Sequence, residues 1–144
     1  WQAVLGVHLT GTFNMTRAAI PAMREQGYGR IVNVTSYTGL HGNVGRANYA
    51  AAKAGVMALT RCAAVEAAPH GIRINAVAPS LAMHPFLAKV TSEELLAELT
   101  QREAFGRYAE PWEVANVFGP QPSFGLVRWP SSACWSTSHA VGDT

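Results

Sequence analysis

Residues 29–61, GRIVNVTSYTGLHGNVGRANYAAAKAGVMALTR, decide the fold of this chain. The stretch opens with RIVNVTS, a short run rich in β-branched residues that follows Gly29 and ends at Ser36, and this run predicts a buried strand. A loop broken by glycines comes next, and an alanine-rich segment then predicts a long helix over residues 47–68, ended by Pro69 and Gly71. A strand followed by a long helix is the repeating unit of a parallel sheet.

The segments on either side continue this alternation of helix and strand. Before the stretch, apolar residues recur at helical spacing over residues 1–26, which predicts a long helix that bends near Pro21. After it, IRINAVAP predicts a second buried strand, ended by Pro79. Helix, strand, helix and strand with short connections indicate the α/β class, a Rossmann-like doubly wound parallel sheet.

The rest of the chain predicts two further helices and an irregular end. TSEELLAELTQRE, residues 91–103, predicts an amphipathic helix with a capping box that begins at Thr91 or Ser92. EPWEVANV predicts a helix with Pro111 in its first turn, and residues 80–90 show no clear periodicity. From residue 118 the composition changes abruptly to proline, serine and tryptophan, so we expect no regular structure over residues 118–144.

The composition favours one globular domain whose partners are small molecules or a second copy of the chain. The sequence has 144 residues, is 49% hydrophobic and carries a formal net charge of +2 from scattered cations, so it offers no basic stripe for nucleic acid. No apolar run approaches the roughly 20 residues that cross a bilayer. Cys62 and Cys134 are far apart and outside any CxxC spacing, which predicts no disulfide framework, no metal site and a reducing cytoplasm.

Three residues of the first stretch could meet at one edge of the predicted sheet. Tyr49 and Lys53 are four positions apart and therefore share a helix face, and Ser36 lies at the carboxyl end of a strand, where open α/β sheets bind ligands. A nearby ammonium favours the phenolate form of a tyrosine, which could then exchange a proton with an alcohol or ketone. The alternative is that Tyr49 packs, Lys53 is solvated and Ser36 caps the strand end, and the spacing alone favours this alternative.

Several segments in order resemble the short-chain dehydrogenase/reductase family over roughly residues 1–117. They are VHLTGTF, the opening stretch, GIRINAVAPS and FGRYAEPWEVANV. Within the family the chain is most similar to 3-oxoacyl-carrier-protein reductases and related hydroxyacyl-CoA dehydrogenases. The resemblance implies an oxidoreductase that uses NAD or NADP and acts on a ketone or secondary alcohol, with a 3-oxoacyl or 3-hydroxyacyl thioester as the expected substrate. It also implies a homo-oligomer that forms through the two long helices.

The resemblance assigns a role to each residue of the site. It implies that Tyr49 is the acid/base, that Lys53 favours its ionised form and binds the nicotinamide ribose, and that Ser36 orients the substrate oxygen. His8 stands where the family has an asparagine, and it is expected either to replace the amide in a proton relay or to pack between helices. The cofactor-binding residues are expected to be Tyr49, Lys53, Pro79, Ser80 and Ala82, although Ser80 replaces the glycine, and His84 the threonine, of the family.

Two parts of the family pattern are missing from the sequence. The glycine-rich cofactor-binding half that precedes the catalytic half in the family is absent, and Trp1 opens the chain inside a helix, so we expect the sequence to be part of a longer protein. Residues 118–144 do not resemble the family's last strand, and a changed reading frame is our hypothesis for them. The alternative function is a truncated, inactive remnant that acts at most as a helix-mediated association module.

Overall fold

The computed structural model describes residues 1–119 of the chain. Its elements, in chain order, are the helix α1 (Gln2–Leu5), the π-helical turn η1 (Gly6–Thr10), α2 (Gly11–Gln26), β1 (Gly29–Val34), α3 (Thr38–His41), α4 (Ala47–Ala67), the 3-10 turn η2 (Ala68–His70), β2 (Ile72–Val77), α5 (Pro85–Val90), α6 (Glu93–Gln101) and α7 (Pro111–Asn116). The prediction of an irregular segment and the reading-frame hypothesis concern residues 118–144, and almost all of these lie outside the described residues.

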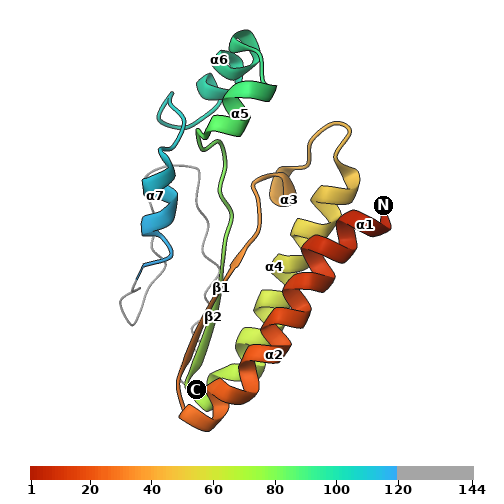
Figure 1. Cartoon of the computed structure of the whole chain (residues 1–144), viewed down its shortest axis with the longest axis vertical. Coiled ribbons are helices and arrows are strands. Elements are labelled where there is room, and N and C mark those ends of the chain that lie inside the picture. The colour runs from red at the N-terminus through yellow and green to blue at the C-terminus, as the bar shows by residue number, and fades with distance from the viewer. Residues whose placement is uncertain (120–144) are drawn as a thin grey trace.

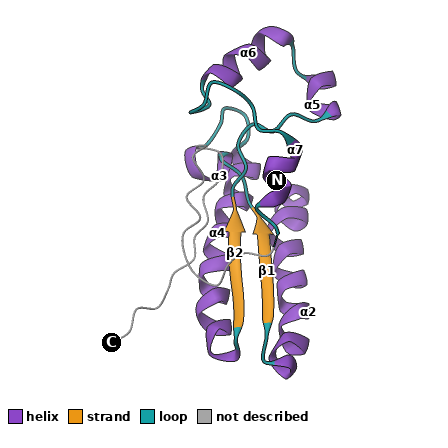
Figure 2. Ribbon diagram, turned by 90° about the vertical axis from the view of Figure 1, so that its left-hand side faces the viewer, coloured by secondary structure: helices purple, strands orange, loops and turns teal. Residues whose placement is uncertain are grey.

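The two predicted strands form a parallel pair, as the α/β reading requires. The register runs from Gly29 opposite Ile72 to Val34 opposite Val77, and α4 makes the crossover between the strands. Figure 2 shows that both strands point to the same end of the molecule, where α3 and α5 lie. β1 ends at Val34, two residues before the predicted end at Ser36, although Thr35 N–H still donates to Val77 O.

The helices α2 and α4 pack together against one face of this sheet. In Figure 1 both lie on the same side of the strands, and α7 lies on the other side. The core between α4 and β2 contains Ala63, Ala67, Ile72 and Ile74, and Ile20 and Met23 of α2 pack against it. Small side chains on α4 allow the helix to approach the sheet closely, which places its first turns beside the carboxyl end of β1.

The structure confirms the two long helices and differs from the sequence reading in their details. Helical backbone runs from Gln2 to Gln26, but it contains the π-helical turn η1, which no sequence pattern indicated. The second long helix ends at Ala67, one residue before the predicted end, and continues as η2. Within residues 1–119, no helix combines the length and the apolar character that a membrane span requires.

A segment containing α5 and α6 extends from the carboxyl end of β2, and we call residues 80–109 the lid. The two ends of the lid are joined, because Met83 N–H donates to Ala109 O at 3.0 Å and Ala109 N–H donates to Leu81 O at 2.8 Å. The helix α5 was not predicted, and His84 caps it by accepting a hydrogen bond from Leu87 N–H. The helix α6 was predicted, and its N-cap is Ser92; the second half of the expected capping box is missing because Leu95 occupies the third helical position.

Candidate active site

The site predicted from the sequence lies at the carboxyl end of the two strands. Beyond the strands the two chain segments stay side by side, because Thr35 N–H donates to Val77 O at 2.8 Å and Tyr37 N–H donates to Pro79 O at 3.1 Å. The bonds made by the residues on either side of Ser36 therefore hold it beside the segment that follows β2. In parallel α/β sheets this is the edge at which ligands bind.

Lys53 is buried between α4 and the end of β1. Its side chain is only 8% exposed, and its Nζ donates a hydrogen bond to Val34 O at 2.9 Å. Burial lowers the pKa of Lys53 below its usual range, because the charged ammonium loses water. An ammonium has three N–H donors, so one bond to a carbonyl leaves it able to donate to a ligand as well.

Tyr49 and His8 lie beside this lysine. Lys53 Nζ is 5.6 Å from the centre of the Tyr49 ring, and the imidazole of His8 meets the same ring edge-on with ring centres 5.1 Å apart. The pKa of His8 is lowered, first by burial and then by the positive charge of Lys53. Three of the four predicted catalytic side chains therefore form one contiguous group.

The π-helical turn η1 carries His8 into this group. Gly11 N–H donates to Gly6 O, five residues back, so the turn contains one residue more than an α-helical turn. The carbonyl of His8 accepts a hydrogen bond from the Thr12 hydroxyl at 2.7 Å. Such single π turns are frequent at functional sites. His8 sits in the middle of this turn, facing Tyr49.

Ser36 is held so that its hydroxyl proton is available. Its Oγ accepts a hydrogen bond from Thr38 N–H at 3.3 Å, and its carbonyl accepts one from Gly39 N–H at 2.9 Å. Because the hydroxyl oxygen already accepts from the chain, its own O–H can donate to a carbonyl oxygen of a substrate. The side chain is half-buried, which leaves it open to a ligand.

The predicted cofactor-binding residues of the second strand are placed differently. Pro79 lies next to the Ser36 loop through the backbone bond to Tyr37. Ser80 donates its hydroxyl to Glu103 Oε1 at 2.5 Å, and Ala82 pairs with Ala109 as an isolated parallel bridge. The contacts of both residues therefore lie within the lid, and the Ser80 hydroxyl is already bonded, so only the backbone of Ser80 can bind a cofactor.

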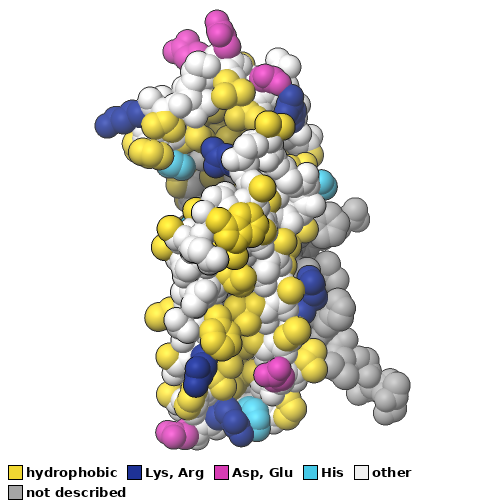
Figure 3. Space-filling view, turned by 90° about the vertical axis from the view of Figure 1, so that its right-hand side faces the viewer, with side chains coloured by type: hydrophobic (Ala, Val, Ile, Leu, Met, Phe, Trp, Pro, Cys, Tyr) yellow, Lys and Arg dark blue, Asp and Glu magenta, His cyan; other side chains and the backbone are white. Residues whose placement is uncertain are grey.

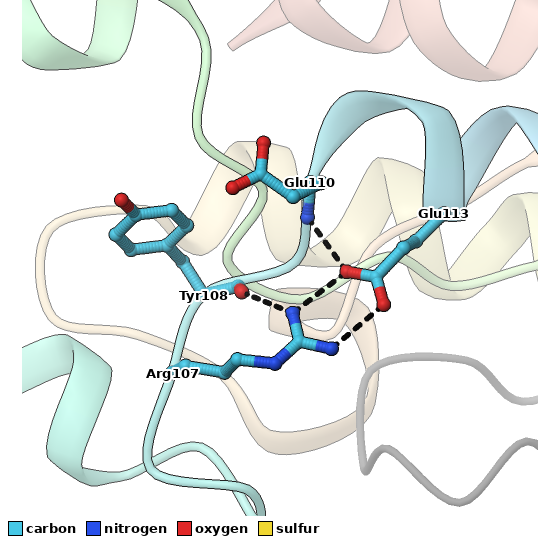
Figure 4. A network of polar contacts seen from close by, with 4 residues as sticks. All are labelled: Arg107, Tyr108, Glu110 and Glu113. Carbon is cyan, nitrogen blue, oxygen red and sulfur yellow. Dashed lines mark hydrogen bonds and ion pairs between the residues drawn. The ribbon is translucent and has the colours of Figure 1, made fainter.

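An ion pair fixes the chain where it leaves the lid. Figure 4 shows Arg107 Nη1 and Nη2 donating to the two carboxylate oxygens of Glu113, each at 2.7 Å, while Glu113 Oε2 also accepts from Glu110 N–H at 2.8 Å. Arg107 and that backbone bond lower the pKa of Glu113 to about 2. The arrangement caps α7 and ties it to the end of the lid.

Two residues of the site were missed by the sequence analysis. Thr35 is 3% exposed and donates its hydroxyl to Lys53 O at 2.9 Å. Gly39 lies against α4, where a Cβ atom would stand 2.9 Å from Ala54 N. The spacing of Gly39 three residues after Ser36 was visible in the sequence, whereas nothing there distinguished Thr35 from any other strand threonine.

Comparison with known proteins identifies the family. The sequence model of a family described as Enoyl-(Acyl carrier protein) reductase matches residues 1–119. The chain belongs to the short-chain dehydrogenase/reductase family. A further comparison shows the fold as well, because the chain resembles a crystal structure of NAD+-bound xylitol dehydrogenase with a TM-score of 0.69 and 31% identity, over 81% of this chain and 52% of that one.

Members of the short-chain dehydrogenase/reductase family with similar sequences include reductases of acyl thioesters. A (5R,7aS)-5-hydroxy-7a-methyl-1-oxo-2,3,5,6,7,7a-hexahydro-1H-indene-carboxyl-CoA reductase of Mycobacterium tuberculosis is 57% identical over 116 residues, which are 80% of this chain and 44% of that protein. The 3-oxoacyl-(acyl-carrier-protein) reductase FabG of Thermotoga maritima is 44% identical over 117 residues, 81% of this chain and 47% of that protein. The chain thus spans about half the length of the curated relatives it matches.

Proposed function

We propose that this chain is the catalytic half, over residues 1–117, of an NAD(P)-dependent oxidoreductase that moves hydride between the nicotinamide cofactor and the ketone or alcohol carbon of an acyl thioester. The observation that carries the proposal is the group formed by Tyr49, Lys53 and His8 beside Ser36 at the carboxyl end of the strands. The names of the similar reductases, which act on CoA or carrier-protein thioesters, support the substrate class.

The proposed proton path uses Ser36 and Tyr49. In the reducing direction the Ser36 hydroxyl and the Tyr49 hydroxyl donate hydrogen bonds to the substrate carbonyl oxygen, which polarises the carbonyl. When bound, NADH or NADPH supplies the hydride to the carbonyl carbon. Tyr49 then gives its proton to the carbonyl oxygen, and the neighbouring ammonium of Lys53 stabilises the phenolate that remains.

The residues present fit the nicotinamide end of such a cofactor. Lys53 already bonds to Val34 O and has further N–H donors with which it can bind ribose hydroxyls. Pro79 and the backbone of Ser80 and Ala82 follow the end of β2, and Pro79 lies beside the Ser36 loop. We assign His8 to the return of a proton from solvent to the Tyr49 hydroxyl through a bridging water, supported by the position of its imidazole beside the Tyr49 ring.

Sequence identity favours a CoA thioester with a compact ring system over a straight acyl chain. The relative that acts on a bicyclic indene-carboxyl-CoA is 57% identical, against 42% for an acetoacetyl-CoA reductase of Rhizobium meliloti. Apolar side chains of the lid could accommodate either group, because Phe86, Val90 and Phe105 are all more than half exposed. We therefore place the bicyclic CoA thioester first among the substrates to be tested.

The helices α1, η1, α2 and α4 present the surface that we propose for a homo-oligomer. Figure 3 shows this side of the molecule, where hydrophobic side chains run along most of the length and acidic side chains lie mainly near the two ends. Val7, Met15 and Val65 are 71%, 73% and 58% exposed. Pairing of the two long helices with a second copy would cover them.

A cytoplasmic location is also proposed, supported by the free thiol of Cys62.

The proposed function is tested by cofactor oxidation in the intact protein that carries this sequence. Purified protein is mixed with NADH or with NADPH, and the loss of absorbance of the reduced cofactor is followed with the bicyclic CoA thioester, acetoacetyl-CoA and a 3-oxoacyl carrier protein. We expect turnover with at least one thioester and one cofactor. Absence of turnover with every pair, in a folded protein, would overturn the proposal.

A further inference from the structure

Two levels of polar contact join β1 to α4 below the site. At the lower level Asn33 Nδ2 donates to Thr60 Oγ1 at 2.9 Å, and the Thr60 hydroxyl donates to Val56 O at 2.7 Å. At the upper level the Thr35 hydroxyl donates to Lys53 O at 2.9 Å. Asn33, Thr35 and Thr60 are all at most 7% exposed, so these bonds form away from water.

At the upper level Lys53 is bonded through its side-chain ammonium and through its backbone carbonyl. Val34 O accepts from the ammonium, and the hydroxyl of the next residue, Thr35, donates to the backbone carbonyl. The ammonium lies at the end of a flexible four-carbon side chain, so its bond alone does not fix the helix backbone. The bond from Thr35 does, because it joins two main chains through one short, β-branched side chain.

Thr35 is also the residue that precedes Ser36, and Lys53 lies one turn after Tyr49 in α4. A single hydroxyl bond therefore links the segment that carries the serine to the helix that carries the tyrosine and the lysine. From this geometry we propose that Thr35 is a positioning residue, whose bond to the Lys53 carbonyl sets where Tyr49 and Lys53 stand relative to Ser36. The proposal rests on the proposed function, in which Ser36 and Tyr49 act on the substrate oxygen and Lys53 stabilises the phenolate of Tyr49.

The chemistry makes this position important. Proton transfer requires the tyrosine hydroxyl within about 3 Å of the substrate oxygen, and a misplacement of about 1 Å can lower a rate by roughly 100-fold. Replacement of Thr35 by valine keeps the shape of the side chain and removes the hydroxyl. Without the bond, α4 is free to shift along β1 at the level of Lys53, while the core below still holds the helix on the sheet.

The test compares three variants of the intact protein. We expect Thr35→Val to lower kcat by about 10- to 100-fold with KM for the thioester changed by less than about three-fold. Thr35→Ser keeps the hydroxyl and should restore kcat to within about three-fold of the unmodified protein. Thr60→Val is the matched control, because it is the same substitution at a buried threonine on the lower level.

The control separates positioning from stability. Thr60→Val leaves the buried amide of Asn33 without its acceptor, so it should lower the melting temperature at least as much as Thr35→Val, yet leave kcat within about two-fold. The proposal is overturned if Thr35→Val keeps full kcat, if Thr35→Ser fails to restore it, or if Thr60→Val lowers it equally.

A second readout does not depend on activity. Crystal structures of the variants give the distance between the hydroxyl oxygens of Tyr49 and Ser36 directly. We expect this distance to change by about 1 Å in Thr35→Val and to stay the same in Thr60→Val. An unchanged distance in Thr35→Val would overturn the role of Thr35 even if the intact protein reduced no thioester, whereas a changed distance without reduction would overturn the proposed function alone.

Discussion

Replacement of Gly39 by alanine should loosen α3 from the catalytic helix. A Cβ atom at this position would stand 2.9 Å from Ala54 N and 3.0 Å from the C and Cβ atoms of Lys53. These atoms belong to α4, which is fixed on the sheet, so α3 must move away. Alanine is favoured over glycine in a helix by about 0.5–1 kcal/mol, but overpacking of this kind costs about 1–3 kcal/mol. The unfavourable contact should outweigh the higher helix propensity of alanine, with a net loss of stability of about 1–2 kcal/mol.

Gly6→Ala provides the matched control for this substitution. A Cβ atom at Gly6 meets no other atom within 4 Å, and the residue already has helical backbone angles, φ −57° and ψ −47°. The same change should therefore stabilise the protein by about 0.5–1 kcal/mol. Urea unfolding of the intact protein measures both values, and turnover should fall only in Gly39→Ala because Gly39 N–H also bonds to Ser36 O. The reasoning is refuted if Gly39→Ala stabilises the protein as Gly6→Ala does.

Three further predictions concern pH and assembly. The pKa of His8 is lowered from 6.5, so the unfolded chain binds more protons at this residue than the folded chain does, and stability falls as the pH drops from above 6.5 toward the lowered pKa. His8→Asn should remove this part of the fall, which thermal melts at a series of pH values measure. The pKa of Glu113 is lowered to about 2 from 4.5, so its ion pair with Arg107 stabilises the protein above pH 4.5 and loses this effect as the pH falls toward 2. Glu113→Gln should therefore make stability depend less on pH between 4.5 and 2. The same pH dependence in Glu113→Gln would contradict a stabilising role of the ion pair. Met15→Asp should shift sedimentation toward the monomer, and an unchanged oligomer would exclude this face.

The elements that carry the site could be predicted because each has a strong local pattern. The runs around Ile31 and Ile74 are rich in β-branched residues, and the long helices show apolar or small residues at helical spacing over many turns. The helix α5 was missed because it has only six residues, too few to show a period. The signal it did have was Pro85 at its first position behind His84, which caps it.

The details that place the side chains could not be predicted from the sequence. The π turn around His8 depends on a backbone bond five residues back, which Gly6 and Gly11 permit but do not require. The role of Thr35 depends on how far α4 lies along β1, and that distance is set by packing of the whole core. Local patterns give the order of the elements, whereas such contacts between distant residues appear only in three dimensions.

The most direct test of the account compares two tyrosines of the same region. Tyr49→Phe removes the proposed proton donor, and Tyr37→Phe removes a hydroxyl from the neighbouring ring that stacks on His41. In the intact protein, with reduced cofactor and the best thioester, we predict that Tyr49→Phe lowers kcat at least about 100-fold while Tyr37→Phe stays within about three-fold. Binding of NADH or NADPH, measured by fluorescence, should persist in both variants. Full turnover in Tyr49→Phe would contradict the assignment of this residue and the mechanism built on it.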